Sequence, residues 1–333
     1  MEISLGFGLA LCAAACVAAA ALTALARRYA LARQLVDAPG ERRSHVVATP
    51  RGGGIAVVAV VLPTMAWLGL NSDANAPILL ATACGLALVA AIGWIDDHRP
   101  LSPLLRLGVH IVAAALLAVA VAWSGAPAWW GLVVFALSLG LINVWNFMDG
   151  INGIASIQAM LVAIACLWLG ARGDVALLSG LFAACCIGFL PFNFPNARIF
   201  LGDVGSGALG YVVACLIALA PVADPVAALP WLLPLSAFLI DAALTLLSRI
   251  MRRERWWTPH VQHMYQRCVQ AGHSHAAVTG GYAAWTLISI LFAVWVAGAP
   301  RPVIIGAFAT WYLLGVAIWL NFRVRHTRRM RPS

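Results

Sequence analysis

The sequence predicts an all-α, polytopic membrane protein with about eleven transmembrane helices. Of its 333 residues, 63% are hydrophobic and only 10% are charged, whereas about a quarter of a soluble domain is charged. A transmembrane helix needs about 20 mainly apolar residues, and runs of this order recur along the chain. Because no internal repeat or domain boundary stands out, we treat residues 1–333 as one membrane domain.

Eleven apolar runs are the expected membrane spans. Several contain Gly or Pro, which membrane helices tolerate. A signal peptide is the alternative for the first run, but no basic segment precedes it and Arg27-Arg28 follow it, so we expect it to be retained. The runs cover residues 3–26, 52–70, 77–95, 107–123, 128–147, 155–170, 175–192, 206–221, 228–247, 278–298 and 302–321.

The arginines set the expected orientation. The chain has no lysine, and 19 of its 21 arginines fall on one side of the expected spans, while Arg172 and Arg301 fall on the other. Positively charged loops stay in the cytoplasm, so we expect a periplasmic N-terminus and a cytoplasmic C-terminus. The same loops account for the net charge of +9, which therefore does not indicate a nucleic-acid partner.

An aspartate pair follows the expected span 77–95 in the stretch "GWIDDHRP". Asp96 and Asp97 are adjacent, and carboxylates so close together repel each other unless a cation lies nearby. We expect them to face a metal ion bound to a phosphorylated substrate. The alternative is that they cap a loop and pair with Arg99 and Arg106.

Two glycine-containing turns place further carboxylates on the same face. "INVWNFMDGINGIAS" puts Asp149 beside Gly150, and a plain turn with a capping Asp is its alternative. "FNFPNARIFLGDVGSGALGY" puts Asp203 among glycines before a span, where free backbone N–H groups can receive an anion. These carboxylates suit Mg²⁺, which takes one or two of them and keeps other positions for water and phosphates.

Amide, guanidinium and imidazole groups near the aspartates suit a phosphorylated ligand. The expected binding residues are Asn146, Asn193, Asn196, Arg198, Arg51 and His45. Ordinary positive-inside charge is the alternative for the loop that contains Arg51. His260 and His263 have i, i+3 spacing without a nearby carboxylate, which is weak for zinc, so we expect them to hydrogen-bond a diphosphate.

Five motifs in this order resemble the polyprenyl-phosphate N-acetylhexosamine-1-phosphate transferases, glycosyltransferase family 4. They are "SHVVATPRGGG", "GWIDDHRPLSPLLR", "NVWNFMDGINGIAS", "FNFPNARIFLGDVGSG" and "HVQHMYQR" followed by "GHSH". The resemblance covers nearly the whole chain. The segment 260–267 is more similar to the bacterial branch that initiates O-antigen or related surface polysaccharides than to the triple-histidine loop of the muramoyl-pentapeptide enzymes.

The resemblance implies a reaction and a location. A polyprenyl phosphate in the membrane attacks the β-phosphate of a UDP-N-acetylhexosamine, giving a polyprenyl-diphospho-sugar and UMP. Mg²⁺ is required, with Mn²⁺ as its substitute. The protein would lie in the bacterial inner membrane with its active site facing the cytoplasm. The sequence leaves open which UDP-sugar is used and the oligomeric state, including a homodimer.

The resemblance also implies roles for individual residues. Asp96 and Asp97 would be the active-site pair, Asp203 the metal ligand, and Asp149 part of the nucleotide and metal region. His260 and His263 would contact the diphosphate or the nucleotide. Many members have a second Asp where this chain has Asn152, so we assign that residue no essential role.

Two other classes of membrane protein are alternatives to the transferase family. A transporter or lipid flippase is expected to place ionisable residues near the midplane of broken helices, and Asp241 is the one acidic residue clearly within an expected span. A CDP-alcohol phosphotransferase is expected to carry a DGxxAR run, whereas "DGINGIA" continues without the arginine. Both alternatives therefore fit the sequence less well than the transferase family.

We predict that topology reporters fused after Gly125 and Arg172 report the periplasm, and that those fused after Arg99 and Arg255 report the cytoplasm. The physical reason is the retention of arginine-rich loops on the cytoplasmic side. Paired periplasmic and cytoplasmic reporter enzymes measure this directly. A cytoplasmic signal after Gly125 would contradict the eleven-span topology.

Overall fold

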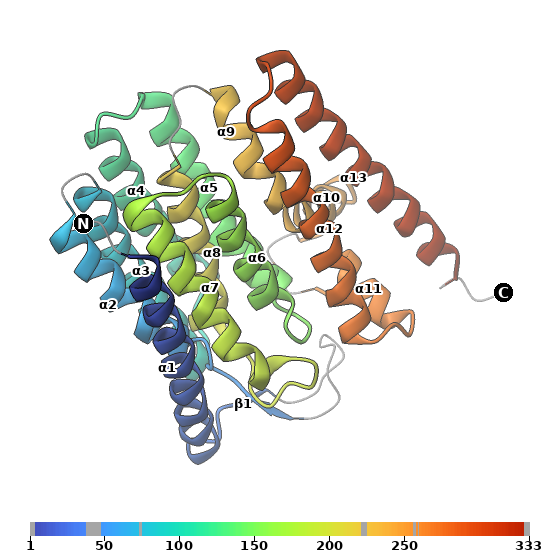
Figure 1. Ribbon diagram of the computed structural model, residues 1–333. Helices are drawn as coiled ribbons and strands as arrows, with labels where there is room; N and C mark the ends of the chain where they lie inside the picture. The colour runs from blue at the N-terminus through green and yellow to red at the C-terminus, as the bar shows by residue number, and fades with distance from the viewer. Residues whose placement is uncertain are drawn as a thin grey trace.

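The computed structural model describes residues 4–37, 48–72, 75–220, 225–255, 258 and 260–329. The all-α prediction is confirmed. Regular structure in these residues is helical, apart from an antiparallel ribbon in which β1 (Val36–Asp37) pairs with β2 (Thr49–Pro50). Neighbouring helices run along one another to form a bundle (Figure 1).

Every expected span coincides with helix. The helices are α1 (Leu5–Ala32), α2 (Ile55–Asn71), α3 (Ala76–His98), α4 (Pro103–Trp123), α5 (Ala128–Met148), α6 (Ile154–Trp168), α7 (Gly173–Asn193), α8 (Asp203–Ala218), α9 (Pro225–Leu232), α10 (Ser236–Met251), α11 (Met264–Gln270), α12 (His275–Val296) and α13 (Arg301–Arg329). A 3₁₀ turn joins α9 to α10, so these two form the expected span 228–247. The short helix α11 was not expected.

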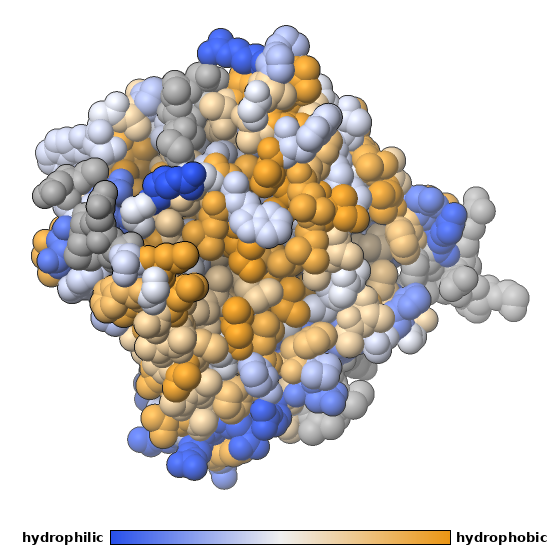
Figure 2. All heavy atoms as spheres, in the orientation of Figure 1, coloured by the Kyte–Doolittle hydropathy of each residue, from blue (hydrophilic) through white to orange (hydrophobic). Residues whose placement is uncertain are grey.

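Within the described residues, eight helical segments are long and apolar enough to cross a membrane. The helices α2, α6 and α8 are apolar but shorter, with 17, 15 and 16 residues. Figure 2 shows apolar residues across the middle of the molecular surface and hydrophilic ones mainly toward its periphery. The polytopic class is therefore supported, while the count of eleven crossings and the orientation stay predictions.

Helix α8 is the central element of the bundle. All of its residues after Asp203 are buried, as expected for a helix that is apolar all round. It packs against α3 and α5 at very close range, because glycines face the neighbouring backbones. A Cβ at Gly210 would lie 2.3 Å from the carbonyl oxygen of Leu141, and one at Gly93 would lie 2.5 Å from that of Asp203. This packing brings the start of α8 to the end of α3.

The glycine-rich segment before α2 is bound to the segment before α8. The backbone N–H groups of Gly53 and Gly54 donate to the carbonyl oxygens of Phe200 and Leu201, each at 2.9 Å. Gly54 also faces Gly205 so closely that a Cβ on Gly54 would lie 2.1 Å from the Gly205 Cα. The starts of α2 and α8 are therefore held as one unit, beside the ends of α3 and α5.

The C-terminal helices α10, α12 and α13 form a separate side of the bundle (Figure 1). They enclose small apolar clusters of their own, such as the one formed by Ile240, Met264 and Trp319. The main apolar core lies among α1 to α8 and extends to α10. The molecule thus has a tightly packed N-terminal part and a more loosely packed C-terminal side.

We predict that Gly54→Ala lowers the thermal unfolding midpoint of the purified protein by about 2–4 °C. Overpacking of this kind is destabilising by about 1–3 kcal/mol, and here the clash is with backbone, which cannot rotate away. The control is Gly108→Ala in α4, where an added Cβ meets nothing within 4 Å. Equal midpoints for the two variants would show that the α2–α8 contact is not tight.

Candidate active site

Four aspartates and one arginine line a pocket of about 220 Å³, which we call the carboxylate pocket. They are Asp37, Asp97, Asp149, Asp203 and Arg51. The pocket lies at the arginine-rich end of the bundle, where α3 and α5 end and α8 begins. The structure thus brings together Asp97, Asp149 and Asp203, which the sequence placed on one face.

Asp97 holds the start of α8. Its side chain lies in the last turn of α3 and is buried, and its two carboxylate oxygens accept from the backbone N–H groups of Asp203 and Val204, each at 3.1 Å. Free N–H groups at a helix start attract negative charge. Gly202 has φ +73°, and a Cβ there would lie 2.5 Å from Asp97 Oδ2. The anion expected at this glycine-framed turn is therefore Asp97 itself.

Arg106 bridges two of the carboxylates. Its Nη1 lies 2.8 Å from Asp96 Oδ2 and 3.1 Å from Asp203 Oδ2. The other oxygen of Asp96 accepts from the backbone N–H of Leu101 at 2.6 Å. The alternative that the aspartate pair caps a loop and pairs with Arg106 is thus correct for Asp96. Asp96 does not line the carboxylate pocket, so it acts there through Arg106.

Asp149 is the least compensated carboxylate of the pocket. No described residue donates a hydrogen bond to its side chain, whereas Asp203 Oδ1 accepts from Asn146 Nδ2 at 2.9 Å. Burial raises the pKa of Asp149 well above its usual range, and the nearby charges of Asp203 and Asp97 raise it further. Among the described residues, the pocket is therefore lined by more carboxylates than cations.

The donor set fits a hard divalent cation that keeps part of its shell for other ligands. Among the described residues, no three His, Cys, Asp or Glu side chains form a ready-made metal cage. Mg²⁺ does not need one, because it is typically held by one or two carboxylates plus water and substrate phosphates. Asp149, which receives no hydrogen bond from the described residues, and Asp203 are the residues that could hold such an ion.

Three of the expected binding residues line the carboxylate pocket in different roles: Asn146, whose amide donates to Asp203, and Arg51 and Asn193. Arg51 Nη2 donates to the backbone carbonyl of Asp97, and its Nε lies 3.9 Å from Asp97 Oδ1. Asn193 uses its amide within the protein, accepting from Gly153 N and donating to Ile199 O, both at 2.9 Å. Asn193 therefore fixes two turns of the pocket, and Arg51 keeps a guanidinium at its edge.

The remaining expected binding residues lie away from the pocket or outside the described residues. Asn196 is exposed and does not line the pocket. Arg198 is also exposed, donates to the carbonyl of Pro191 at 2.6 Å, and lies over the ring of Phe192. His45 lies outside the described residues. A ligand contact for these three residues stays a prediction.

Neither His260 nor His263 lines the carboxylate pocket. His263 is buried, and its Nδ1 lies 3.8 Å from Asp241 Oδ1. Burial and the neighbouring His263 lower the pKa of His260 to about 4, so that ring is neutral at pH 7. The expected diphosphate contact stays a prediction. From the same loop, it is Gln266 of α11 that reaches the pocket.

Asp241 is a structural anchor within the bundle. Its carboxylate accepts from the backbone N–H of Met264 at 2.8 Å, the Tyr282 hydroxyl at 2.6 Å and Trp319 Nε1 at 3.1 Å. It thus ties α10 to α11, α12 and α13. An intramembrane carboxylate so fully hydrogen-bonded gives the transporter alternative no support. The spacing of the histidines did not show that a carboxylate lies beside His263.

Comparison with known proteins assigns the family. The model of glycosyl transferase family 4 matches residues 79–220. Over 84% of its length, the chain is 32% identical to the decaprenyl-phosphate N-acetylglucosaminephosphotransferase of Mycolicibacterium smegmatis, of which 78% is covered. The chain belongs to glycosyl transferase family 4. The suspected resemblance is thereby confirmed.

Other relatives come from two groups of this family. A probable undecaprenyl-phosphate N-acetylglucosaminyl 1-phosphate transferase of Bacillus subtilis is 27% identical, with 76% of this chain and 75% of that protein covered. A phospho-N-acetylmuramoyl-pentapeptide-transferase of Synechococcus is 31% identical, with 75% and 76% covered. The general class of polyprenyl-phosphate phosphotransferase is supported, and the O-antigen branch stays a prediction.

Several site residues were not expected from the sequence. Asp37, Ser206 and Gln266 line the carboxylate pocket of this family member, and the contact of Arg106 with Asp203 adds to the pairing with Asp96 that was one of the alternatives. Ser206 lies in the quoted glycine-rich motif and accepts from Asn146 Nδ2 at 3.3 Å, so the motif itself was a usable signal. Asp37 and Gln266 reach the pocket only through long-range packing, which no local pattern reveals.

We predict opposite effects of two aspartate-to-asparagine changes on the thermal unfolding midpoint in chelator-containing buffer. Asp97→Asn lowers it, because the NH₂ group of the asparagine amide would face one of the two α8 N–H groups and leave it without an acceptor. Such a buried, unsatisfied donor is destabilising by about 1–3 kcal/mol. Asp149→Asn raises it, because the substitution removes a charge that its neighbours repel.

The pH dependence gives a second readout for Asp149. A carboxyl whose pKa is raised in the folded state destabilises the protein as it ionises, so the wild-type protein loses stability as pH rises above the usual pKa of 3.8. The gain from Asp149→Asn should therefore increase from acidic to neutral pH. A gain that is constant with pH, or a loss, would show that Asp149 is compensated in the folded protein.

Proposed function

We propose that the protein transfers an N-acetylhexosamine-1-phosphate from a UDP-sugar to a polyprenyl phosphate such as undecaprenyl phosphate, releasing UMP. The observation that carries this proposal is the convergence of Asp97, Asp149 and Asp203 in one pocket at the arginine-rich end of a membrane bundle. The names of the relatives support the reaction class. The product would begin a lipid-linked surface glycan such as O-antigen.

The charges of the pocket suit a phosphoryl transfer. Such reactions depend on positioning and charge stabilisation more than on covalent help from the protein. Asp149 and Asp203 would hold Mg²⁺, or Mn²⁺ in its place, which when bound neutralises charge on the diphosphate of the donor. Arg51 presents its guanidinium beside Asp97, and Arg106 presents its own beside Asp203; a guanidinium can bind a phosphate through two hydrogen bonds.

The aspartate pair is proposed to position rather than to abstract a proton. Asp97 uses both carboxylate oxygens to fix the start of α8, and Asp96 orients Arg106. The attacking lipid phosphate is already largely anionic at neutral pH, so a general base has little to contribute. In this scheme Asp97 keeps Asp203, and Asp96 keeps Arg106, at the place where the donor diphosphate would bind.

The placement of the pocket suits one soluble and one lipid substrate. It lies where helices end, so a UDP-sugar can enter from the aqueous side while a polyprenyl phosphate stays in the bilayer. The arginine asymmetry supports a location of this end of the bundle on the cytoplasmic side of a bacterial inner membrane. This orientation is part of the proposal.

The proposal is tested with the purified full chain, a polyprenyl phosphate and a panel of UDP-N-acetylhexosamines. We expect a polyprenyl-diphospho-sugar, identified by mass, and UMP, with both products absent when a chelator removes divalent cations. Formation of products in excess chelator would overturn the metal assignment. Absence of any lipid-linked product with the whole panel would overturn the function.

A matched pair of variants locates the chemistry. We predict that Asp203→Asn lowers turnover by about a hundredfold or more, a loss typical of removing one electrostatic group from an active site, and weakens Mg²⁺-dependent binding of UDP-sugar. The control is Asp174→Asn, because Asp174 also lies in the first turn of a helix but contacts Ser72, far from the pocket. Similar losses in both variants would contradict the assignment.

A further inference from the structure

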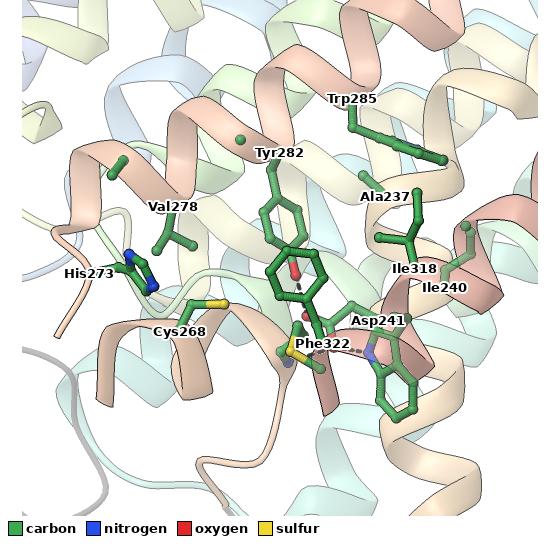
Figure 3. Close-up of a pocket in the computed structure, with 15 residues that line it drawn as sticks. Ala237, Ile240, Asp241, Cys268, His273, Val278, Tyr282, Trp285, Ile318 and Phe322 are labelled. Carbon is green, nitrogen blue, oxygen red and sulfur yellow. Dashed lines mark hydrogen bonds between the residues drawn. The ribbon is translucent and has the colours of Figure 1, made fainter. Parts of the chain in front are cut away.

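A second cavity lies among α10, α11, α12 and α13, and we call it the apolar cavity. Its volume is about 340 Å³, within the range of about 300–1,000 Å³ typical of ligand sites. Figure 3 shows side chains from all four helices around it, such as Ile240, Val278, Ile318 and Phe322. No residue lines both this cavity and the carboxylate pocket.

The apolar cavity is open toward the outside of the bundle. Gly281 lines it and is exposed, and a Cβ there would meet nothing within 4 Å. Phe322 and Ile318, on α13, are 46% and 38% exposed. A molecule in the surrounding membrane can therefore reach the cavity from the side.

The one carboxylate at the apolar cavity is already satisfied by the protein. Asp241 points toward Tyr282 in Figure 3 and accepts its hydroxyl hydrogen bond. It also accepts from Met264 N and Trp319 Nε1. The cavity thus presents hydrocarbon and aromatic surface to an occupant, with no carboxylate in need of a partner.

A group of arginines, which we call the arginine cluster, lies beside the apolar cavity. The guanidinium of Arg323 lies 4.9 Å from the ring centroid of Trp319, a residue that lines the cavity. Arg252 and Arg267 are close enough to act electrostatically on Arg323. Arg249 also belongs to the cluster, through its pairing with Glu254 at 3.1 Å.

The arginine cluster carries excess positive charge. Its acidic member is Glu254, whose carboxylate lies 3.1 Å from Arg249 and 3.9 Å from Arg252. Burial and repulsion by Arg252 lower the pKa of Arg267, and attraction to Asp241 and Glu254 acts in the opposite direction. An anion at this position would relieve that repulsion.

We propose that the apolar cavity and the arginine cluster bind an anionic phospholipid of the surrounding bilayer. One acyl chain occupies the cavity, and the phosphate lies against Arg323 and Arg267. Charge complementarity and lateral access select this occupant. Each arginine near a membrane surface contributes about 1 kcal/mol to the binding of anionic lipid. A neutral lipid would fill the same cavity without this contribution.

The polyprenyl phosphate acceptor is a poorer occupant for this site. Its phosphate has to reach the carboxylate pocket, whereas Arg323 lies beside Trp319, which lines the apolar cavity. On that short helix Met264 and Cys268 line the apolar cavity, while Gln266 lines the carboxylate pocket. A phosphate held by Arg323 is therefore separated by α11 from the proposed reaction centre.

The test uses native mass spectrometry of the full chain in detergent, titrated with phosphatidylglycerol or with phosphatidylcholine of the same acyl chains. We expect one molecule of phosphatidylglycerol to bind more tightly than phosphatidylcholine by about tenfold. Gly281→Phe should abolish this binding by filling the cavity. The control is Gly280→Phe, because Gly280 also has open space around its Cβ but does not line the cavity.

A charge variant separates the headgroup from the chain. Arg323→Gln should weaken phosphatidylglycerol binding by about fivefold, while the exposed Arg325→Gln should leave it unchanged. Equal binding of the two lipids, or equal effects of Gly281→Phe and Gly280→Phe, would overturn the proposal. These measurements need no catalytic activity, so they stand or fall independently of the proposed function.

The acceptor lipid is tested as the competing occupant. We expect Gly281→Phe to leave the KM for polyprenyl phosphate within about twofold of the wild-type value. If instead it raises that KM by about tenfold or more, and polyprenyl phosphate displaces phosphatidylglycerol from the wild-type protein, the cavity is the acceptor site and the proposal is wrong.

Discussion

The candidate site depends on the contact between the Asp97 carboxylate and the start of α8. Two backbone N–H groups and a buried carboxylate meet there, and this pairing compensates both the unpaired donors of a helix start and a buried negative charge. Because Asp203 is the first residue of α8, the same contact fixes its position. The distances from Asp203 to Asn146 and Arg106 follow from it.

That contact depends on glycines at the positions where the helices meet, because glycine has no side chain to hold the backbones apart. Gly93 and Gly210 let α8 approach the backbones of α3 and α5, and the Gly54–Gly205 contact brings α2 to the same point. A Cβ at any of these positions would clash with a backbone atom of the neighbouring segment, so the start of α8 would have to shift. The glycines of the motifs therefore serve close packing here, and a role in ligand binding stays a prediction.

The local part of the structure could be predicted from the sequence, and the long-range part could not. Apolar runs located every helical span, and the turns at Asp149 and Asp203 followed from their glycines, because these features depend on neighbouring residues. The bridge by Arg106 and the placement of Asp241 beside His263 join residues far apart in the chain. Such pairings depend on helix packing, which hydrophobicity alone does not specify.

The short helix α11 lies between the carboxylate pocket and the apolar cavity, and the charged residues near these two sites are of opposite sign. In the described part of the chain, four aspartates and one arginine line the carboxylate pocket, whereas four arginines and one glutamate form the arginine cluster. A phosphate that approaches the carboxylate pocket without a cation is repelled, while one that approaches the arginine cluster is attracted. Under the proposed function, the acceptor phosphate would therefore enter its site only after a cation and the donor are bound there. Membrane phosphates would meanwhile be held at the arginine cluster, away from the reaction.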